Sequence, residues 1–233
     1  ETGSWGRDLP DSPRLCDLLR AVDALPGIGR VRLGSLDPSV MTPRFVEIVS
    51  ALPSLAPHFH LSVQSGCSAT LARMHRRYNA DQAEAAIARL RAAIPHVQLT
   101  TDMIVGFPGE TEEEFAASLA FARRVGFLHI HVFPYSRRPG TKADAMPEQL
   151  SHAVKSARAH EAQRVADACK QRYLVQQVGQ TLPVLFETEH DGSWVGHSDN
   201  YCLVRAAGDD LRGLVKNVKI SAVSGQMLVG DLV

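Results

Sequence analysis

The stretch TTDMIVGFPGETEEEFAASLAFARRVGF, residues 100–127, decides the fold class of this 233-residue chain. An apolar run ends at a Gly-Phe-Pro-Gly turn, and a helical pattern follows in which Thr111 and Glu114 have capping-box spacing. Gly126 then supplies a residue that readily ends a helix. Apolar residues recur on one stripe of this helix: Phe115, Leu119 and Ala122. The stretch therefore predicts a strand, a tight turn and an amphipathic helix that packs on a sheet.

The turn itself, VGFPGET at residues 105–111, leaves two interpretations open. It is not a P-loop, because no Gly-Lys-Ser/Thr follows, and it lacks the third spaced glycine of a Rossmann fingerprint. It is either a structural turn or one wall of a nucleotide site, since an apolar strand end can flank an adenine. Gln64 and Ser65 also allow two interpretations: their side chains either bind a ribose or a carboxylate, or they only cap the helix that follows.

Similar strand and helix patterns surround this unit. Strands are expected at Arg30–Leu36, Phe59–Gln64, Leu99–Phe107 and Leu128–Tyr135. Helix starts are expected at Ser12 with Pro13, at Thr42 with Pro43, and at Asp81 with Glu84. Repeated strand–helix units predict a parallel sheet covered by helices, with ligands at the carboxyl ends of the strands. The residues expected to converge on that rim are Ser35, Gln64, Ser65, Gly106 and Tyr135.

The sequence texture changes after a long helical stretch that runs from Ser151 to about Val175. Five short β-like runs follow within about 60 residues, separated by Gly- and Asp-containing turns, which favours a small barrel of the oligonucleotide-binding type. We therefore expect a partial βα barrel over residues 1–145, a connecting helix over 146–170 and an all-β barrel over 171–233.

Composition excludes some classes of function. The chain has 25 basic residues (Lys and Arg) and 25 acidic residues (Asp and Glu), so its net charge predicts no partner. No apolar run has the roughly 20 residues of a membrane helix. The cysteines are unpatterned, which is typical of reduced thiols in a cytoplasmic protein: Cys16, Cys67, Cys169 and Cys202. His129 and His131 share a strand face and are interpreted as sheet histidines, so no metal site is predicted, and no catalytic triad is evident.

Basic residues form two clusters that suit a polyanion. Residues 73–78, RMHRRY, offer three arginines beside a tyrosine, and a second arginine pair follows the last predicted strand of the sheet. The alternative is a solvated helix face. The arginines concerned are Arg73, Arg76, Arg77, Arg137 and Arg138.

Several long motifs together resemble the radical S-adenosylmethionine tRNA methylthiotransferases. They are FHLSVQSG (59–66), LARMHRRY (71–78), DMIVGFPGET (102–111) and HVFPYSRRPGT (131–141). GQTLP (179–183) and WVGHSDNY (194–201) resemble the TRAM domain, a small RNA-binding β-barrel. The second and fourth motifs look most like the branch that acts on threonylcarbamoyladenosine.

The resemblance implies a six-unit βα partial barrel, of which this chain holds about four units. Such enzymes bind S-adenosylmethionine on a [4Fe–4S] cluster, take electrons from a donor, and add a methylthio group to C2 of the adenosine at position 37 of tRNA. The cluster motif C-x-x-x-C-x-x-C does not occur in this chain, so we expect a carboxy-terminal part that is inactive alone. Its sheet edge beside Arg30–Leu36 is expected to be exposed and to make it less stable than the whole enzyme.

Carried onto this sequence, the resemblance assigns two groups of residues. The S-adenosylmethionine neighbours are Ser35, Gln64, Ser65, Asp102, Ile104 and Tyr135. The contacts with the tRNA anticodon stem-loop are Arg73, Arg76, Arg77, Arg137, Arg138, Lys216 and Lys219. The two lysines are included because the net charge of residues 171–233 is negative, so that RNA contact by this region must depend on local basic patches. Alternatives are a non-catalytic tRNA-binding module, a methylthiotransferase for isopentenyladenosine or a ribosomal protein, and an unrelated βα enzyme with a nucleotide substrate.

Overall fold

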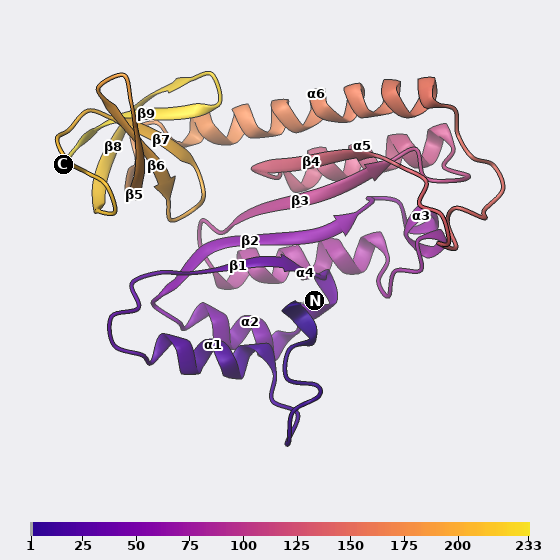
Figure 1. Ribbon diagram of the computed structural model, residues 1–233, viewed down its shortest axis with the longest axis horizontal. Helices are drawn as coiled ribbons and strands as arrows, with labels where there is room; N and C mark the ends of the chain where they lie inside the picture. The colour runs from indigo at the N-terminus through magenta and orange to yellow at the C-terminus, as the bar shows by residue number, and fades with distance from the viewer. Residues whose placement is uncertain (1) are drawn as a thin grey trace.

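The computed structural model describes residues 2–233, and its first unit is a four-stranded parallel sheet (Figure 1). The strands follow the chain in the order β1-β2-β3-β4. Their bounds are β1 (Val31–Leu36), β2 (Leu55–Gln64), β3 (Gln98–Val105) and β4 (His129–Pro134). The helices are α1 (Leu15–Asp23), α2 (Pro43–Ser50), α3 (Ser68–Arg73), α4 (Ala80–Ala93), α5 (Glu112–Val125) and α6 (His152–Gln177), with 3-10 turns at η1 (Thr2–Ser4) and η2 (Pro38–Val40). The predicted parallel sheet is confirmed.

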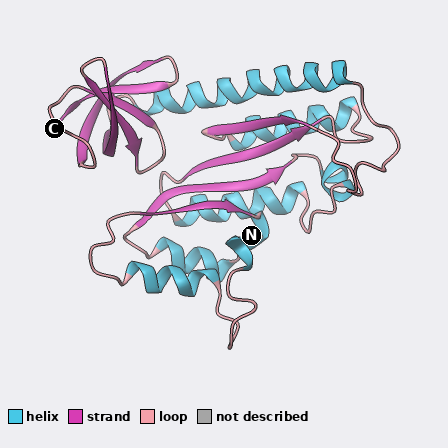
Figure 2. Ribbon diagram, viewed as in Figure 1, coloured by secondary structure: helices cyan, strands magenta, loops and turns pink. Residues whose placement is uncertain are grey.

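The second unit is a closed five-stranded barrel, which Figure 2 shows beside one end of the sheet. Its strand order is β5-β6-β7-β9-β8. The bounds are β5 (Thr181–His190), β6 (Ser193–Ser198), β7 (Leu203–Ala206), β8 (Val215–Ser224) and β9 (Met227–Leu232). Five strands in a barrel were expected here, whereas the identification as a TRAM domain stays a prediction.

The two faces of the sheet differ because side chains alternate along each strand. Phe59, Leu61 and Val63 of β2 face the helices and belong to one buried core with residues of six helices. His60 of β2 and Asp102 of β3 are only partly buried and lie on the other face. The sheet therefore has one apolar face under helices and one polar face.

Local signals placed some helices correctly and others wrongly. Thr42 and Thr111 cap α2 and α5 as predicted, and Gly126 ends α5 in a left-handed conformation, with φ of 64°. Asp81 does not begin α4, because Asn79 with Gln82 forms the capping box two residues earlier. Ser12 does not cap α1 either; it lies in a turn with φ of 44°, and α1 begins only at Leu15.

The long helix α6 does more than connect the two units. Ala162, Val165 and Cys169 are buried in the core of the sheet, and Leu174 is buried in the core of the barrel. The helix lies along β4 and runs into the barrel (Figure 1). Core membership changes near the predicted boundary at Lys170, so one helix holds both units in place. No helix among residues 2–233 has the length and apolarity needed to cross a membrane.

Candidate active site

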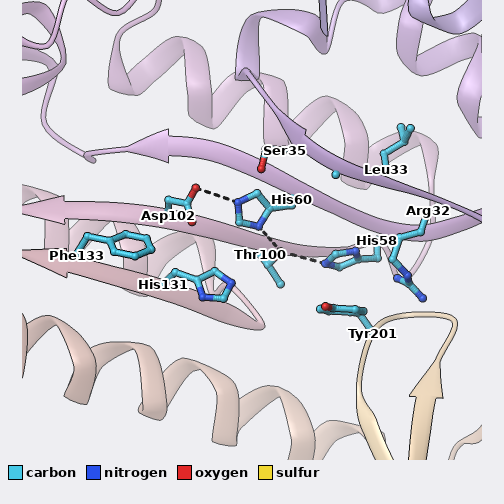
Figure 3. A pocket seen from close by; sticks show the side chains of 11 residues that line it. Arg32, Leu33, Ser35, His58, His60, Thr100, Asp102, His131, Phe133 and Tyr201 are labelled. Atoms are coloured by element: carbon cyan, nitrogen blue, oxygen red, sulfur yellow. Dashed lines mark hydrogen bonds and ion pairs between the residues drawn. The ribbon is translucent and has the colours of Figure 1, made fainter. Parts of the chain in front are cut away.

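A hollow of about 560 Å³ opens on the polar face of the sheet (Figure 3). Volumes of this size are typical of small-ligand sites. Four neighbouring strands and one turn of the barrel contribute the lining. The lining residues are Arg32, Leu33, Gly34, Ser35, His58, His60, Thr100, Asp102, His131, Phe133 and Tyr201. Most lining residues therefore have polar side chains, although apolar atoms contribute at least as much of the exposed lining, and Arg32 and Asp102 are its only Lys, Arg, Asp or Glu residues.

A chain of hydrogen bonds fixes the histidines of β2. The Nε2 atom of His60 lies 3.2 Å from Oδ2 of Asp102, and its Nδ1 lies 2.9 Å from Oγ1 of Thr100. The Nε2 atom of His58 lies 3.1 Å from the same Thr100 oxygen. Burial lowers the pKa of His58 to about 3, so this imidazole is neutral at pH 7. Thr100 thus sets the orientation of two rings at once.

The barrel closes the hollow at the amino-terminal ends of the strands. Tyr201, in the turn between β6 and β7, stacks on His58 and on His197, with ring centroids 4.4 and 5.0 Å away. The guanidinium of Arg32 lies 4.8 Å over the Tyr201 ring and donates to the Ser198 carbonyl over 3.1 Å. The floor of the hollow is therefore built by both units.

The residues predicted as S-adenosylmethionine neighbours have different environments. Ser35 and Asp102 line the hollow together. Ile104 is half-buried near the carboxyl end of β3, and the Tyr135 hydroxyl is buried without a hydrogen-bond partner among residues 2–233. A buried hydroxyl without a partner is the kind of group that a bound ligand satisfies.

Gln64 and Ser65 are less available as side-chain ligands. The Ser65 hydroxyl lies 2.9 Å from the Ser118 hydroxyl on α5 and accepts a hydrogen bond from the Cys67 N–H, so it faces the helix layer. Gln64 is buried with φ of 67°, a conformation that is costly for a residue with a side chain. Cys67, and not Ser65 or Ser68, precedes the first turn of α3.

The two glycine N–H groups of the Gly-Phe-Pro-Gly turn are hydrogen-bonded to residues outside the turn. The Gly106 N–H donates to Oε2 of Glu110 over 2.7 Å, and the Gly109 N–H donates to the Glu148 carbonyl over 3.1 Å. Burial raises the pKa of Glu110, while Gly106 and the Arg158 guanidinium at 2.8 Å oppose that rise. Both glycine N–H groups of the turn are thus already used within the chain.

The predicted RNA-binding residues fall into two groups at opposite ends of the sheet (Figure 1). Arg73 pairs with Glu114, and Arg137 with Asp144 over 2.7 Å. The other cations are fully or partly exposed, and no ion pair within residues 2–233 engages them: Arg76, Arg77, Arg138, Lys216 and Lys219. A ligand touching both groups must span the sheet, roughly 30 Å for a strand as long as β2.

Sequence reasoning missed much of the hollow. It did not select Arg32, His58, His60 or Thr100, and it did not place Tyr201 beside them. The alternation in HFHLSVQ (58–64) marked the polar face of β2, but the contact with Tyr201 spans more than 140 residues and left no local signal.

The side chains present suit some metals better than others. His60, Asp102 and His131 place one ligand atom each within 4.8 Å of one another. No cysteine belongs to such a group within the described part of the chain; Cys16, Cys169 and Cys202 are buried, and Cys67 is half-buried. These thiols do not form the thiolate set that an iron–sulfur cluster requires.

Comparison with known proteins decides the family. The Radical SAM superfamily matches residues 3–122, just over half of the chain. The chain belongs to the radical SAM superfamily. "Coproporphyrinogen III oxidase (HemN)" from Escherichia coli, a radical SAM enzyme, shares the fold with a TM-score of 0.54. The match covers 91% of this chain and 58% of that one, at 14% sequence identity.

Curated relatives of this radical SAM chain are tRNA methylthiotransferases. A tRNA-2-methylthio-N(6)-dimethylallyladenosine synthase of Chloroflexus aurantiacus is 40% identical over 97% of this chain and 50% of its own length. The threonylcarbamoyladenosine tRNA methylthiotransferase MtaB of Bacillus subtilis is 35% identical over 94% of this chain and 50% of its own length. The chain spans about half the length of these relatives.

Proposed function

We propose that this chain works within a tRNA methylthiotransferase that adds a methylthio group to C2 of an N6-modified adenosine at position 37. The relatives named above support the reaction class. The hollow supports the position of the substrate, because its volume is typical of small-ligand sites and polar side chains of four strands line it. Before it acts, the whole enzyme also needs an electron donor.

The N6 substituent that we propose is threonylcarbamoyl. This group carries a carboxylate and a hydroxyl, which match the basic and polar lining formed by Arg32, His60 and Thr100. A dimethylallyl group is a hydrocarbon, and it would desolvate those side chains without replacing their hydrogen bonds. The polar lining is the observation that carries this proposal.

Dimethylallyladenosine is the second candidate, and it has its own support. The Chloroflexus relative, which acts on that base by name, is 40% identical to this chain, against 35% for the threonylcarbamoyladenosine enzyme. Overall identity weighs every position equally, whereas substrate choice depends on the few residues around the substituent. A binding experiment separates the two candidates directly.

For S-adenosylmethionine we propose contacts at the carboxyl ends of β3 and β4. Ile104 offers an apolar surface, and the Tyr135 hydroxyl offers a hydrogen bond that no residue among 2–233 supplies. S-adenosylmethionine, when bound on its cluster, supplies the radical for the reaction. The described residues do not supply the cluster's thiolates, so we expect no cleavage of S-adenosylmethionine by this chain alone.

For the anticodon stem-loop we propose a footprint on the exposed arginines that follow β2 and β4. Arg77 and Arg138 are free to bind phosphate, while Arg73 and Arg137 are paired within the chain. Arginine forks match phosphate oxygens well. Lys216 and Lys219 lie on the barrel, at the other end of the sheet, and would contact a more distant part of the tRNA.

The test compares three fluorescent anticodon stem-loops that carry threonylcarbamoyladenosine, dimethylallyladenosine or unmodified adenosine at position 37. We expect the first to bind this chain at least about tenfold more tightly than the second, which corresponds to ~1.4 kcal/mol. Arg77→Glu should weaken all three and flatten their salt dependence, whereas Arg20→Glu, an exposed change on α1, should not. Tighter binding of the dimethylallyl form would overturn the substrate, and no binding of any form would overturn the tRNA function.

A further inference from the structure

Three side chains from three adjacent strands converge inside the hollow (Figure 3). They are His60 of β2, Asp102 of β3 and His131 of β4. Asp102 and His131 are direct register partners across β3 and β4, so the backbone itself brings them to the same level. Two imidazoles and a carboxylate on one face of a sheet form a common set of ligands for divalent transition metals.

The arrangement around His60 is the one expected of a metal ligand. Its Nδ1 is held by the Thr100 hydroxyl at 2.9 Å, which leaves Nε2 directed toward Asp102. Histidines that bind metals usually have the second ring nitrogen fixed in this manner by an outer group. Thr100 is itself positioned by β3 and also by its contact with His58.

The third ligand is free to complete the set. His131 is exposed, and within residues 2–233 no hydrogen bond holds either of its ring nitrogens; its contacts are ring contacts with His60, His129 and Phe133. Two ligands that each lie about 2.1 Å from one ion are at most about 4.2 Å apart. The three ligand atoms lie within 4.8 Å of one another, so a small rotation of His131 suffices.

The charge balance also favours a cation at this point. Among the described residues, the Asp102 carboxylate meets only the His60 imidazole, with Oδ2 3.2 Å from Nε2, and no Lys or Arg neutralises it. Arg32, the nearest cation of the lining, is bound to the Ser198 carbonyl at the floor of the hollow and stacks on Tyr201. A partly buried carboxylate without a full countercharge attracts a metal ion.

We propose that His60, Asp102 and His131 bind one first-row divalent ion, such as Zn²⁺ or Fe²⁺, inside the sheet's hollow. The three ligands occupy one side of the ion, so its remaining positions face the hollow and accept an oxygen ligand such as a carboxylate. This site rests on the chain's own side chains and does not depend on the proposed reaction. The sequence prediction of no metal site weighed the histidines alone and missed the carboxylate between them.

The test uses the 233-residue chain after treatment with a chelator, titrated with Co²⁺ as a spectroscopic probe. We expect one Co²⁺ per chain and visible d–d absorption without the charge-transfer band of thiolate ligation. Asp102→Asn and His131→Ala should each weaken binding by at least about tenfold. Thr100→Val should weaken it by roughly ten- to a hundredfold, as loss of an outer-shell partner does.

His129→Ala is the matched control, because His129 lies on the same strand and face but outside the group of three. It should leave the Co²⁺ affinity unchanged. Circular dichroism of each variant shows that the fold is intact, and His131 is exposed enough for its loss to leave the core untouched. The proposal is overturned if the chain does not bind one Co²⁺, or if Co²⁺ affinity is unchanged in Asp102→Asn and His131→Ala. It is also overturned if His129→Ala loses as much Co²⁺ affinity as those variants, or if the spectrum shows a thiolate charge-transfer band.

Discussion

The ion pair between Glu110 and Arg158 should be the most sensitive polar contact in the chain. Their side chains are 1% and 9% exposed, and their charged atoms are 2.8 Å apart. Arg158 also donates to the Glu110 carbonyl over 2.9 Å and to the Glu112 carboxylate over 3.1 Å. Because Glu110 accepts from the Gly106 N–H, the pair also holds the turn at the end of β3.

Arg158→Met removes the guanidinium, which lies 5.2 Å over the Phe115 ring, and leaves an unbranched apolar side chain in its place. Attraction across 2.8 Å is worth ~6 kcal/mol at an effective dielectric constant of about 20. Desolvation of both groups offsets part of that attraction, and breaking buried pairs typically costs about 3–5 kcal/mol. We expect a loss in that range at pH 8, because the Glu110 carboxylate then stays buried and charged without its partner.

The loss should depend on pH, and its sign is fixed by Glu110. Burial already raises the pKa of Glu110 above the ordinary carboxyl value, and removing Arg158 raises it further. A group whose pKa is raised on folding favours the folded state at low pH and loses that advantage as pH rises through the folded-state pKa. The deficit of Arg158→Met should therefore be full at pH 8 and smaller at pH 5.

Urea unfolding followed by circular dichroism at both pH values measures the deficit. The matched control is Arg124→Met, which breaks a pair of similar length, 2.9 Å, whose side chains are 55% and 41% exposed. Surface pairs contribute less than about 1 kcal/mol. The reasoning fails if Arg158→Met costs no more than Arg124→Met at pH 8, or if its cost is the same at both pH values.

Three further predictions concern stability. Gly66→Ala should lower the free energy of unfolding in urea by about 1–3 kcal/mol, because the new Cβ would lie 2.4 Å from the Phe121 Cβ. Gly29→Ala, whose Cβ meets no atom within 4 Å, should have no effect. Equal effects of the two substitutions would contradict this. The folded-state pKa of His58 is about 3, so His58 should lower the free energy of unfolding by roughly 1.4 kcal/mol per pH unit as pH falls from about 6.5 toward that value. A His58→Gln variant whose free energy of unfolding has the same pH dependence as the wild type would count against this. Tyr201→Leu removes the ring stacks with His58 and His197, so it should lower the free energy of unfolding by about 1–3 kcal/mol and with it the thermal unfolding temperature. An unchanged unfolding temperature would mean that the barrel docks on the sheet without these stacks.

Sequence periodicity predicted the sheet well because its signals are local. The strand β3 and the helix α5 follow from apolar alternation, a capping box and one glycine, all within 30 residues. The start of α4 was misplaced because Asn79 and Asp81 are both good caps, and only the reciprocal bonds with Gln82 distinguish them. The strand β2 begins at Leu55, earlier than predicted, because pairing with β1 extends it past Pro57.

The site was harder to predict for a different reason. The rule that parallel strands carry ligands at their carboxyl ends predicted Ser35, which lines the hollow, whereas Asp102, which also lines it, was predicted from the resemblance to the methylthiotransferases. The rule says nothing about which polar groups are already satisfied. Only the structure shows that the Ser65 hydroxyl is used by Ser118 and that the glycine turn is closed by Glu110.

The position of the barrel has a consequence for substrate choice. Tyr201 and the Ser198 carbonyl come from the barrel, yet they fix Arg32 and His58 at the floor of a hollow that is otherwise formed by the sheet. Because the floor is shared, a change in the turn between β6 and β7 should alter the size and charge of the hollow. If the proposed function holds, variants of that turn should therefore change substrate preference, and variants of the exposed arginines should change RNA affinity.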